Sequence, residues 1–275
     1  MGAVIPAVCL GRIVESRHPD FNPGAVTWSW SMAGWQQYQI VDMADPLQLS
    51  GLRVLHPDPQ IPLSYYLSGC GVTSLTAYFG LTKIGKPRIG ETVLISGAAG
   101  AVGSIAGQIA KNILGCRVVG IDVGKEKCDY LVQTLGFDQA IDAHRSSDMI
   151  AAIKNACPEG VDVFFDNIGG ETLDAALMTI NVGARILMCG RLAAYEKDYK
   201  SIPGPYNMWQ LIVKNARIEG FLTHPYAGEY EGATRLIETW TKCGLLKFRE
   251  HVVEGLENTL DAFRSIYTGT SKGRL

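Results

Sequence analysis

A glycine-rich run, Ser96–Gly103, carries the clearest chemical signal in the chain, with the sequence SGAAGAVG. The run directly follows a short apolar stretch typical of a buried strand and directly precedes a helical pattern. Glycine at position 100 allows the backbone to approach a diphosphate, and Gly103 allows the helix to pack closely on the strand. This context favours a dinucleotide-binding turn over a turn that binds nothing. The candidate residues of the turn are Ala98, Gly100, Ala101, Val102 and Gly103.

A carboxylate follows at the end of the next predicted strand, where Asp122 stands 19 residues after Gly103. In a dinucleotide-binding fold, a carboxylate at that place accepts hydrogen bonds from the ribose 2′-hydroxyl of NAD and repels the 2′-phosphate of NADP. Lys125 and Lys127 begin the next predicted helix, where an ammonium group can hold a phosphate. Asp122 therefore favours NAD(H), whereas the lysines either favour NADP(H) or form a solvated first turn. These residues leave the choice of nucleotide open.

Two further loops follow predicted strands of the same sheet. The sequence Asn167-Ile168-Gly169-Gly170 follows the fourth strand, and Cys189-Gly190 follows the fifth. The carboxyl ends of parallel strands form the edge where such sheets bind ligands. We therefore take Asn167, Gly169, Cys189 and Gly190 as candidate cofactor-binding residues; the alternative is that the glycines only turn the chain.

Other kinds of catalytic site lack support in the sequence. The five histidines lie far apart, and no His, Cys and Glu grouping has the spacing of a catalytic zinc site, so no metal is predicted. The chain also has no G-x-S-x-G motif of the kind that presents a hydrolase serine. Proton chemistry is left to a tyrosine, to water or to a ribose hydroxyl, all of which are compatible with hydride transfer.

A parallel α/β sheet is the scaffold that would position these residues. From about residue 90, short β-branched runs alternate with amphipathic helical stretches, which indicates stacked βαβ units. The expected strands are 92–96, 117–122, 140–142, 161–167, 184–189 and 217–222. Apolar residues recur with helical spacing between Val102 and Ile113, and the opposite face of that helix carries Gln108, Lys111 and Asn112.

The two ends of the chain have a different character. Several tryptophans and prolines before residue 62 indicate short strands and turns. After about residue 244 the same style returns, with an expected strand at Glu250–Val253 and a helix that begins at Asn258. We therefore predict an α/β domain at 63–243, inserted in a mostly β domain made of 1–62 and 244–275.

Composition narrows the class of partner. The 275 residues are 47% hydrophobic and 19% charged, with a net charge of −2, as in ordinary globular proteins. No run of five like charges provides an electrostatic reason to expect nucleic acid or a membrane surface, so a small molecule is the expected partner. Seven scattered cysteines without a C-x-x-C pair argue against a disulfide frame, and we expect a cytoplasmic protein.

Four motifs in order resemble one family, the zinc-independent medium-chain dehydrogenases/reductases. They are GCGVTSLTAYFGL at 69–81, AAGAVG at 98–103, GQIAK at 107–111 and FDNIGG at 165–170. The likeness is greatest to the prostaglandin reductase, 2-alkenal reductase and curcumin reductase group. It implies a Rossmann doubly wound parallel sheet inserted in a mostly β GroES-like domain. This chain would begin part-way through the N-terminal portion of that GroES-like domain. It also implies a homodimer.

The activity implied by the resemblance is reduction of a carbon–carbon double bond conjugated to a ketone or aldehyde, with hydride taken from NADPH. Carried over by residue, Gly100 and Val102–Gly103 would hold the pyrophosphate, and Lys127 would meet the 2′-phosphate. Asn167 would lie beside the cofactor, and Tyr195 near the ribose of the adenosine. Tyr226 is the expected catalytic residue, because the matching tyrosine of the family faces nicotinamide and substrate.

Among the positions that depart from the family pattern, two bear on the choice of cofactor-binding residues. Ser271 stands where the terminal G-x-N-x-G-K motif has asparagine, and we include it among the cofactor-binding candidates. Position 122 is usually small and uncharged in the family, so Asp122 keeps NAD(H) open beside NADP(H). The alternatives to an enone reductase are a quinone reductase of the same fold and a catalytically silent, truncated nucleotide-binding isoform.

Overall fold

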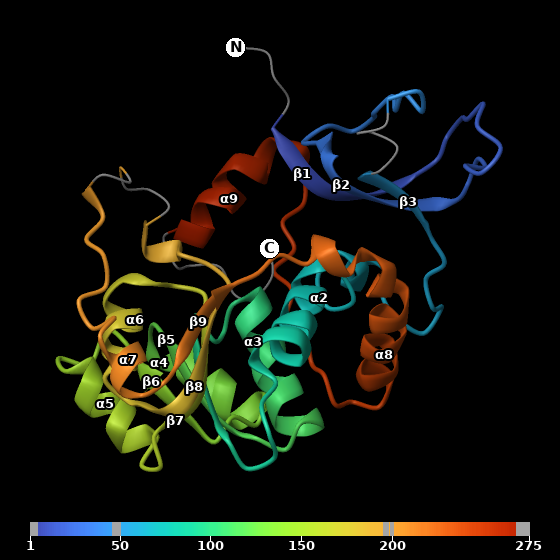
Figure 1. The fold of residues 1–275 in the computed structure, drawn as a ribbon. Helices are drawn as coiled ribbons and strands as arrows, with labels where there is room; N and C mark the ends of the chain where they lie inside the picture. Colours follow the sequence, from blue (N-terminus) through green and yellow to red (C-terminus); the bar gives the residue numbers. More distant parts are fainter. Residues whose placement is uncertain (1–4, 46–50, 195–197, 199–200, 268–275) are drawn as a thin grey trace. The chain divides into compact units, whose positions relative to one another are not determined.

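The computed structural model describes residues 5–45, 51–194, 198 and 201–267, and it divides the chain into two compact units (Figure 1). The α/β unit comprises residues 72–248. The β unit comprises residues 1–71 and 249–275. Each unit is described by itself below, and the α/β limits of 63–243 that the sequence suggests remain a prediction.

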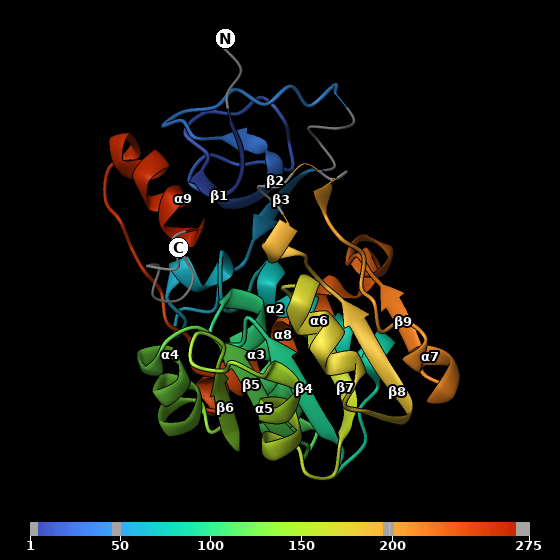
Figure 2. The same cartoon turned by 90° about the vertical axis from the view of Figure 1, so that its left-hand side faces the viewer.

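The α/β unit is built on a six-stranded parallel sheet, which confirms the predicted doubly wound architecture. The strand order is β6-β5-β4-β7-β8-β9, so the chain starts at a central strand and winds outward in both directions (Figure 2). The strands are β4 (Thr92–Ser96), β5 (Arg117–Asp122), β6 (Gln139–Asp142), β7 (Val161–Asp166), β8 (Ile180–Met188) and β9 (Arg217–Gly220).

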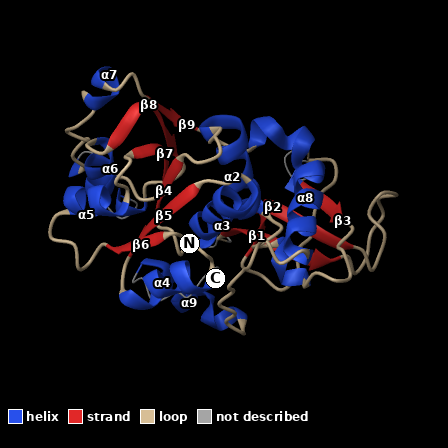
Figure 3. Ribbon diagram, turned by 90° about the horizontal axis from the view of Figure 1, so that it is seen from below, coloured by secondary structure: helices blue, strands red, loops and turns tan. Residues whose placement is uncertain are grey.

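Helices cover both faces of this sheet, with α2 and α3 on one face and α5 and α6 on the other (Figure 3). The α-helices are α2 (Val72–Phe79), α3 (Ala101–Gln108), α4 (Lys125–Asp129), α5 (Met149–Ala156), α6 (Gly170–Leu177), α7 (Gln210–Val213) and α8 (Tyr230–Lys242). Three of them run on into π-helical turns: η2 (Gly80–Gly85) after α2, η3 (Ile109–Ile113) after α3 and η4 (Tyr130–Thr134) after α4. Short 3-10 segments are η5 (Leu192–Ala194) and η7 (His224–Glu229).

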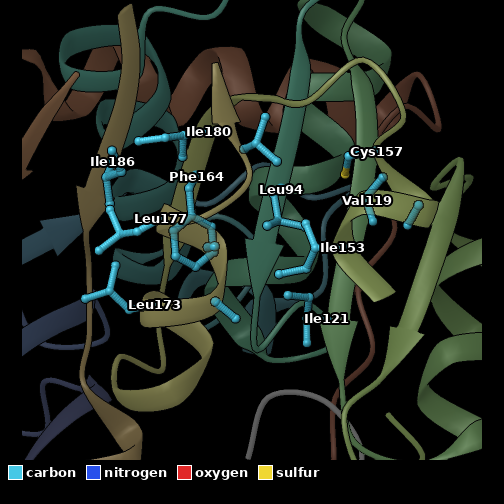
Figure 4. Close-up of a cluster of buried hydrophobic side chains, with 14 of the residues drawn as sticks. Leu94, Val119, Ile121, Ile153, Cys157, Phe164, Leu173, Leu177, Ile180 and Ile186 are labelled. Atoms are coloured by element: carbon cyan, nitrogen blue, oxygen red, sulfur yellow. The ribbon is translucent and has the colours of Figure 1, made fainter. Parts of the chain in front are cut away.

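Burial on both faces explains why the central strands are continuous apolar runs. Every residue of β4 is buried. Leu94 belongs to the cluster that also contains Phe164 of β7, Ile153 of α5 and Leu177 of α6 (Figure 4). Because neighbouring strand residues point to opposite faces, the side chains on either side of Leu94 in β4 face the other helical layer.

The helix predicted between Val102 and Ile113 exists, but its polar face is only partly exposed. Gln108 is 1% exposed, contrary to the expectation that it faces solvent. Its amide nitrogen donates to the carbonyl of Lys247 at 2.9 Å, and its amide oxygen accepts from the Lys247 N–H at 2.7 Å. The chain after α8 therefore returns over this side of the helix and replaces water as the hydrogen-bonding partner.

The β unit contains a three-stranded antiparallel sheet in the order β1-β2-β3. Its elements are β1 (Pro6–Arg12), β2 (Val26–Gly34), β3 (Leu52–Leu55), η1 (Leu63–Tyr66), η8 (Leu256–Asn258) and α9 (Thr259–Tyr267). The helix expected from Asn258 is confirmed as α9, whose Phe263 ring makes an edge contact with Trp35.

The strand expected at Glu250–Val253 is wrong, because only Glu250 forms an isolated bridge there. Side chains fasten this segment instead of a ladder: the Glu250 carboxylate accepts hydrogen bonds from the hydroxyls of Ser64 at 2.8 Å and Ser68 at 2.6 Å. Alternation of residue types indicates a segment that could pair as a β-strand. It does not distinguish a paired strand from a segment that is held by side chains.

None of the helices in the described part of the chain has the length and apolar character needed to span a membrane.

Candidate functional site

The glycine-rich turn, Gly97–Gly103, joins the end of β4 to the start of α3. Gly97 has a φ of +58°, a conformation that side chains rarely adopt. A Cβ added at Gly103 would lie 2.4 Å from the Gly97 carbonyl oxygen and 2.9 Å from the Cα of Ala98. The turn and the first helical residues are therefore so close that only glycine fits at position 103.

The N-terminus of α3 is open to a ligand. Gly100 is its N-cap residue, with extended backbone angles, and no side chain caps the helix. The first amides of a helix have no acceptor within the helix, and they carry the positive end of its dipole. The backbone N–H groups of Ala101, Val102 and Gly103 thus form an anion-binding position that fits the diphosphate of a dinucleotide.

Asp122 and Lys127, which favour different nucleotides, lie together beside this turn. The Asp122 Oδ2 atom accepts a hydrogen bond from the Ala99 N–H at 2.8 Å, and Oδ1 accepts one from the Val123 N–H at 2.8 Å. The Lys127 Nζ lies 3.5 Å from Oδ1, and the two side chains are 29% and 9% exposed respectively. Lys125 instead pairs with Asp129 within its own helix.

A second group of candidates surrounds the end of β7. The Asn167 Nδ2 donates to the Ser96 carbonyl at 2.7 Å, and the Asn167 N–H donates to the Ser96 hydroxyl at 2.9 Å. Gly169 has a φ of +73°, and its N–H donates to both oxygens of Asp166 at 3.0 and 3.1 Å. A Cβ at Gly97 would lie 3.2 Å from the Cδ1 of Ile168, so this loop abuts the glycine-rich turn.

The loop after β8 completes this edge of the sheet. The N–H groups of Cys189 and Gly190 donate to the Asp166 carbonyl at 2.9 and 3.1 Å. A Cβ at Gly190 would lie 2.8 Å from the Asn167 carbonyl oxygen, so the close approach requires glycine. Burial and the nearby charge of Asp166 raise the pKa of the Cys189 thiol to about 12. Cys189 is therefore a neutral thiol at physiological pH and unsuited to act as a nucleophile.

Tyr226 belongs to an aromatic group on the α2 side of the unit. Its ring stacks on that of the fully buried Phe79, with centroids 5.0 Å apart and planes inclined by 18°. The Lys83 Nζ lies 5.7 Å from the centroid of the Tyr226 ring and is hydrogen-bonded to both oxygens of Glu229. The Tyr226 hydroxyl forms no hydrogen bond with any residue that the structure describes.

Two residues near these candidates escape sequence analysis. Asp166 ends an apolar strand and lies in the FDNIGG motif, but the motif assigns it no role, although a buried carboxylate in such a run is a detectable anomaly. Lys83 is separated from Tyr226 by 143 positions, and no local pattern links the two. Tyr195 and Ser271 lie outside the described residues. Among the residues that are described, no group of three or more His, Cys, Asp or Glu side chains could hold a metal ion.

Comparison with known proteins identifies several relatives. The model of a family described as zinc-binding dehydrogenase matches residues 101–239. The NADP(+)-dependent 2-alkenal reductase of Nicotiana tabacum is 37% identical, over 99% of this chain and 76% of that protein. The NADPH-dependent curcumin reductase of Escherichia coli (strain K12) is 35% identical, over 100% of this chain and 78% of that protein. The crystal structure of CurA from Vibrio vulnificus in complex with NADPH has a TM-score of 0.84 and 37% identity, covering 97% of this chain and 77% of that one.

Proposed function

The chain belongs to the medium-chain dehydrogenase/reductase family, in the group of 2-alkenal and curcumin reductases, and on this premise we propose that it is an NADPH-dependent reductase of conjugated carbon–carbon double bonds. Its substrates are small α,β-unsaturated ketones and aldehydes. When bound, the cofactor supplies a hydride from its nicotinamide ring. The observation that carries the proposal is that the N-terminus of α3 has no side-chain cap. It follows a turn that packs so closely on the helix that only glycine fits at position 103.

The cofactor is held by residues of the α/β unit. The amides of Ala101–Gly103 bind the diphosphate, Gly100 lets the backbone approach it, and Lys127 binds the 2′-phosphate. The Lys127 ammonium lies close enough to Asp122 to offset much of the charge of the carboxylate. The paired carboxylate therefore repels a 2′-phosphate less than an unpaired carboxylate would. Tyr195 and Ser271 complete the cofactor contacts, as the family resemblance implies.

The nicotinamide half lies on the other side of β4. Because β5 and β7 are the two neighbours of β4, an adenosine held over the end of β5 directs the rest of the molecule toward β7 and β8. Asn167, Gly169, Cys189 and Gly190 stand at these two strand ends and are the residues we assign to that half.

Tyr226 acts on the substrate. Its hydroxyl has no acceptor or donor among the described residues, and its ring is fixed by Phe79 and Lys83. We assign it a hydrogen bond to the substrate carbonyl oxygen, where negative charge develops when hydride reaches the β-carbon.

The test is the loss of NADPH absorbance on addition of an enone or enal, with a saturated ketone as control. We expect consumption with the unsaturated substrates alone. Faster consumption with quinones than with any enone or enal would favour a quinone reductase. Binding of NADPH without consumption of it by any of these compounds would indicate a silent nucleotide-binding protein.

We further propose that 63–243 is the cofactor domain, with 1–62 and 244–275 forming the catalytic domain, and that the protein is a cytoplasmic homodimer. Strand β9 lies at the edge of its sheet, where a second copy can pair with it. Exposed apolar side chains flank that edge: Tyr206, Trp209, Ile212, Val213 and Leu222. The seven cysteines are free thiols, which fits a reducing compartment.

A further inference from the structure

The side chain of Asp166, at the end of β7, is completely buried and is a centre of hydrogen bonding. The hydroxyl of Ser96 donates to its Oδ1 atom at 2.6 Å. The N–H groups of Ile168 and Gly169 each donate to the same oxygen at 3.0 Å, and that of Gly169 also donates to Oδ2 at 3.1 Å. Among the described residues, no lysine or arginine forms an ion pair with this carboxylate.

These contacts connect three loops at one edge of the sheet. Ser96 is the last residue of β4, immediately before the glycine-rich turn, and it also accepts two hydrogen bonds from Asn167. The main-chain carbonyl of Asp166 accepts from Cys189 and Gly190 after β8. One residue therefore links the turn after β4 with the loops after β7 and β8.

Stability alone is a poor reason for this arrangement. Burial of a carboxylate without a cation is costly, and burial raises the pKa of Asp166 against the opposing hydrogen bonds from Gly169, Ser96 and Ile168. Buried charges are often replaceable by uncharged side chains at no loss of stability. A buried carboxylate that costs stability, at the ligand-binding edge of the sheet, is consistent with a role in fixing the geometry of the neighbouring loops.

We propose that Asp166 and Ser96 are positioning residues that hold the Asn167–Gly169 loop in register with the glycine-rich turn, so that the nicotinamide half of the cofactor is fixed relative to the diphosphate. The inference rests on the proposed function, which supplies the cofactor. Neither residue is assigned a contact with the cofactor; they act through Asn167 and Gly169. The adenosine end, which the proposed function assigns to the end of β5, would be held by residues outside this network.

The test compares two ligands on three variants. NADPH engages both halves of the site, whereas 2′,5′-adenosine diphosphate carries the adenosine, the 2′-phosphate and one phosphate for the glycine-rich turn, but no nicotinamide half. Asp166→Asn keeps the volume but removes the charge, and Ser96→Ala removes only the hydroxyl. Asp162→Asn is the matched control: Asp162 also lies on β7 and accepts hydrogen bonds from Thr92 N–H and Asn181 Nδ2, both at 2.8 Å, but near the other end of the strand.

We expect Asp166→Asn and Ser96→Ala to weaken NADPH binding by about tenfold, as for loss of a charge-assisted hydrogen bond, with little change for 2′,5′-adenosine diphosphate. Asp162→Asn should leave the affinity for both ligands unchanged. Equal weakening of both ligands, or no weakening of NADPH in Ser96→Ala, would overturn the proposal. Since these are binding measurements, they stand even if the wild-type protein reduces no enone, a result that would overturn only the proposed function.

Discussion

At the scale of single residues, Asp122, which favours NAD(H), lies next to Lys127, which favours NADP(H). The Asp122 carboxylate accepts hydrogen bonds from the amides of Ala99 and Val123, and its Oδ1 atom also lies near the Lys127 ammonium. The carboxylate is therefore largely occupied by the protein itself, and the ammonium group that we propose binds the 2′-phosphate lies beside it. Sequence spacing locates both residues, but only side-chain geometry pairs them.

Lys127→Met should therefore discriminate between the nucleotides. We expect a loss of about tenfold or more in NADPH affinity and almost none in NADH affinity, because only NADPH carries the 2′-phosphate. Fluorescence titration with each nucleotide measures this. Lys125→Met is the control, since Lys125 pairs with Asp129. Equal losses for both nucleotides in Lys127→Met would show that the lysine has another role.

Tyr226→Phe should lower turnover while the affinity for NADPH stays the same. The ring stack on Phe79 is kept, and only the hydroxyl is lost. Assistance by a positioned proton donor is worth on the order of a hundredfold in rate. Steady-state kinetics with saturating NADPH and an enone tests this. An unchanged kcat would assign the proton to water.

At the scale of elements, the sequence predicts the parallel strands well because their apolar runs reflect burial on both faces. It fails where tertiary contacts replace local preference. Gln108 is polar yet buried because the backbone of Lys247 satisfies it, and Glu250–Val253 forms no strand. Of the candidate site, the loops are predictable, whereas the hydrogen bond between Ser96 and Asp166 is not, because the two residues are 70 positions apart.

The GQIAK motif, which spans the end of α3 and the start of η3, gives a prediction about helix packing. A Cβ at Gly107 would lie 1.9 Å from the Cζ of Phe137, so Gly107→Ala should destabilise the protein by about 1–3 kcal/mol despite the better helix propensity of alanine. Gly232→Ala in α8 is the control, because a Cβ there meets nothing within 4 Å and should be neutral or stabilising. Urea unfolding compares the two. A stable Gly107→Ala protein would mean that the ring moves aside at little cost.

Asp138 predicts a pH dependence of stability. Its carboxylate accepts from Lys111 Nζ at 2.7 Å and from the Val118 N–H at 2.8 Å, linking η3 with β5. Burial alone would raise the pKa of Asp138, but these two hydrogen bonds hold it below its ordinary value of 3.8. The stabilisation is therefore present above pH 3.8 and is lost as the pH falls through the lower, folded-state pKa.

Asp138→Asn should accordingly lower the free energy of unfolding by about 1–3 kcal/mol at neutral pH, and the difference from wild type should shrink in acid. Unfolding curves at several pH values measure this difference. A gap that stays constant down to the acid limit would contradict the assignment.

At the scale of the whole molecule, the edge strand β9 and its exposed apolar neighbours predict a dimer. Gel filtration with light scattering should give twice the mass of one 29.8 kDa chain. Ile212→Glu, at a side chain that is 85% exposed, should give monomers, whereas Val14→Glu, at a side chain 75% exposed in the β unit, should not. A wild-type monomer at micromolar concentration would contradict the dimer.

In the proposed reaction, hydride passes from NADPH to a conjugated carbon–carbon double bond. The most direct test uses NADPH with deuterium at the transferable C4 position of the nicotinamide, together with an enone, and locates the label in the product by NMR and mass spectrometry. We expect one deuterium on the β-carbon and an intact carbonyl group. Deuterium on the carbonyl carbon, or a product without deuterium, would contradict it.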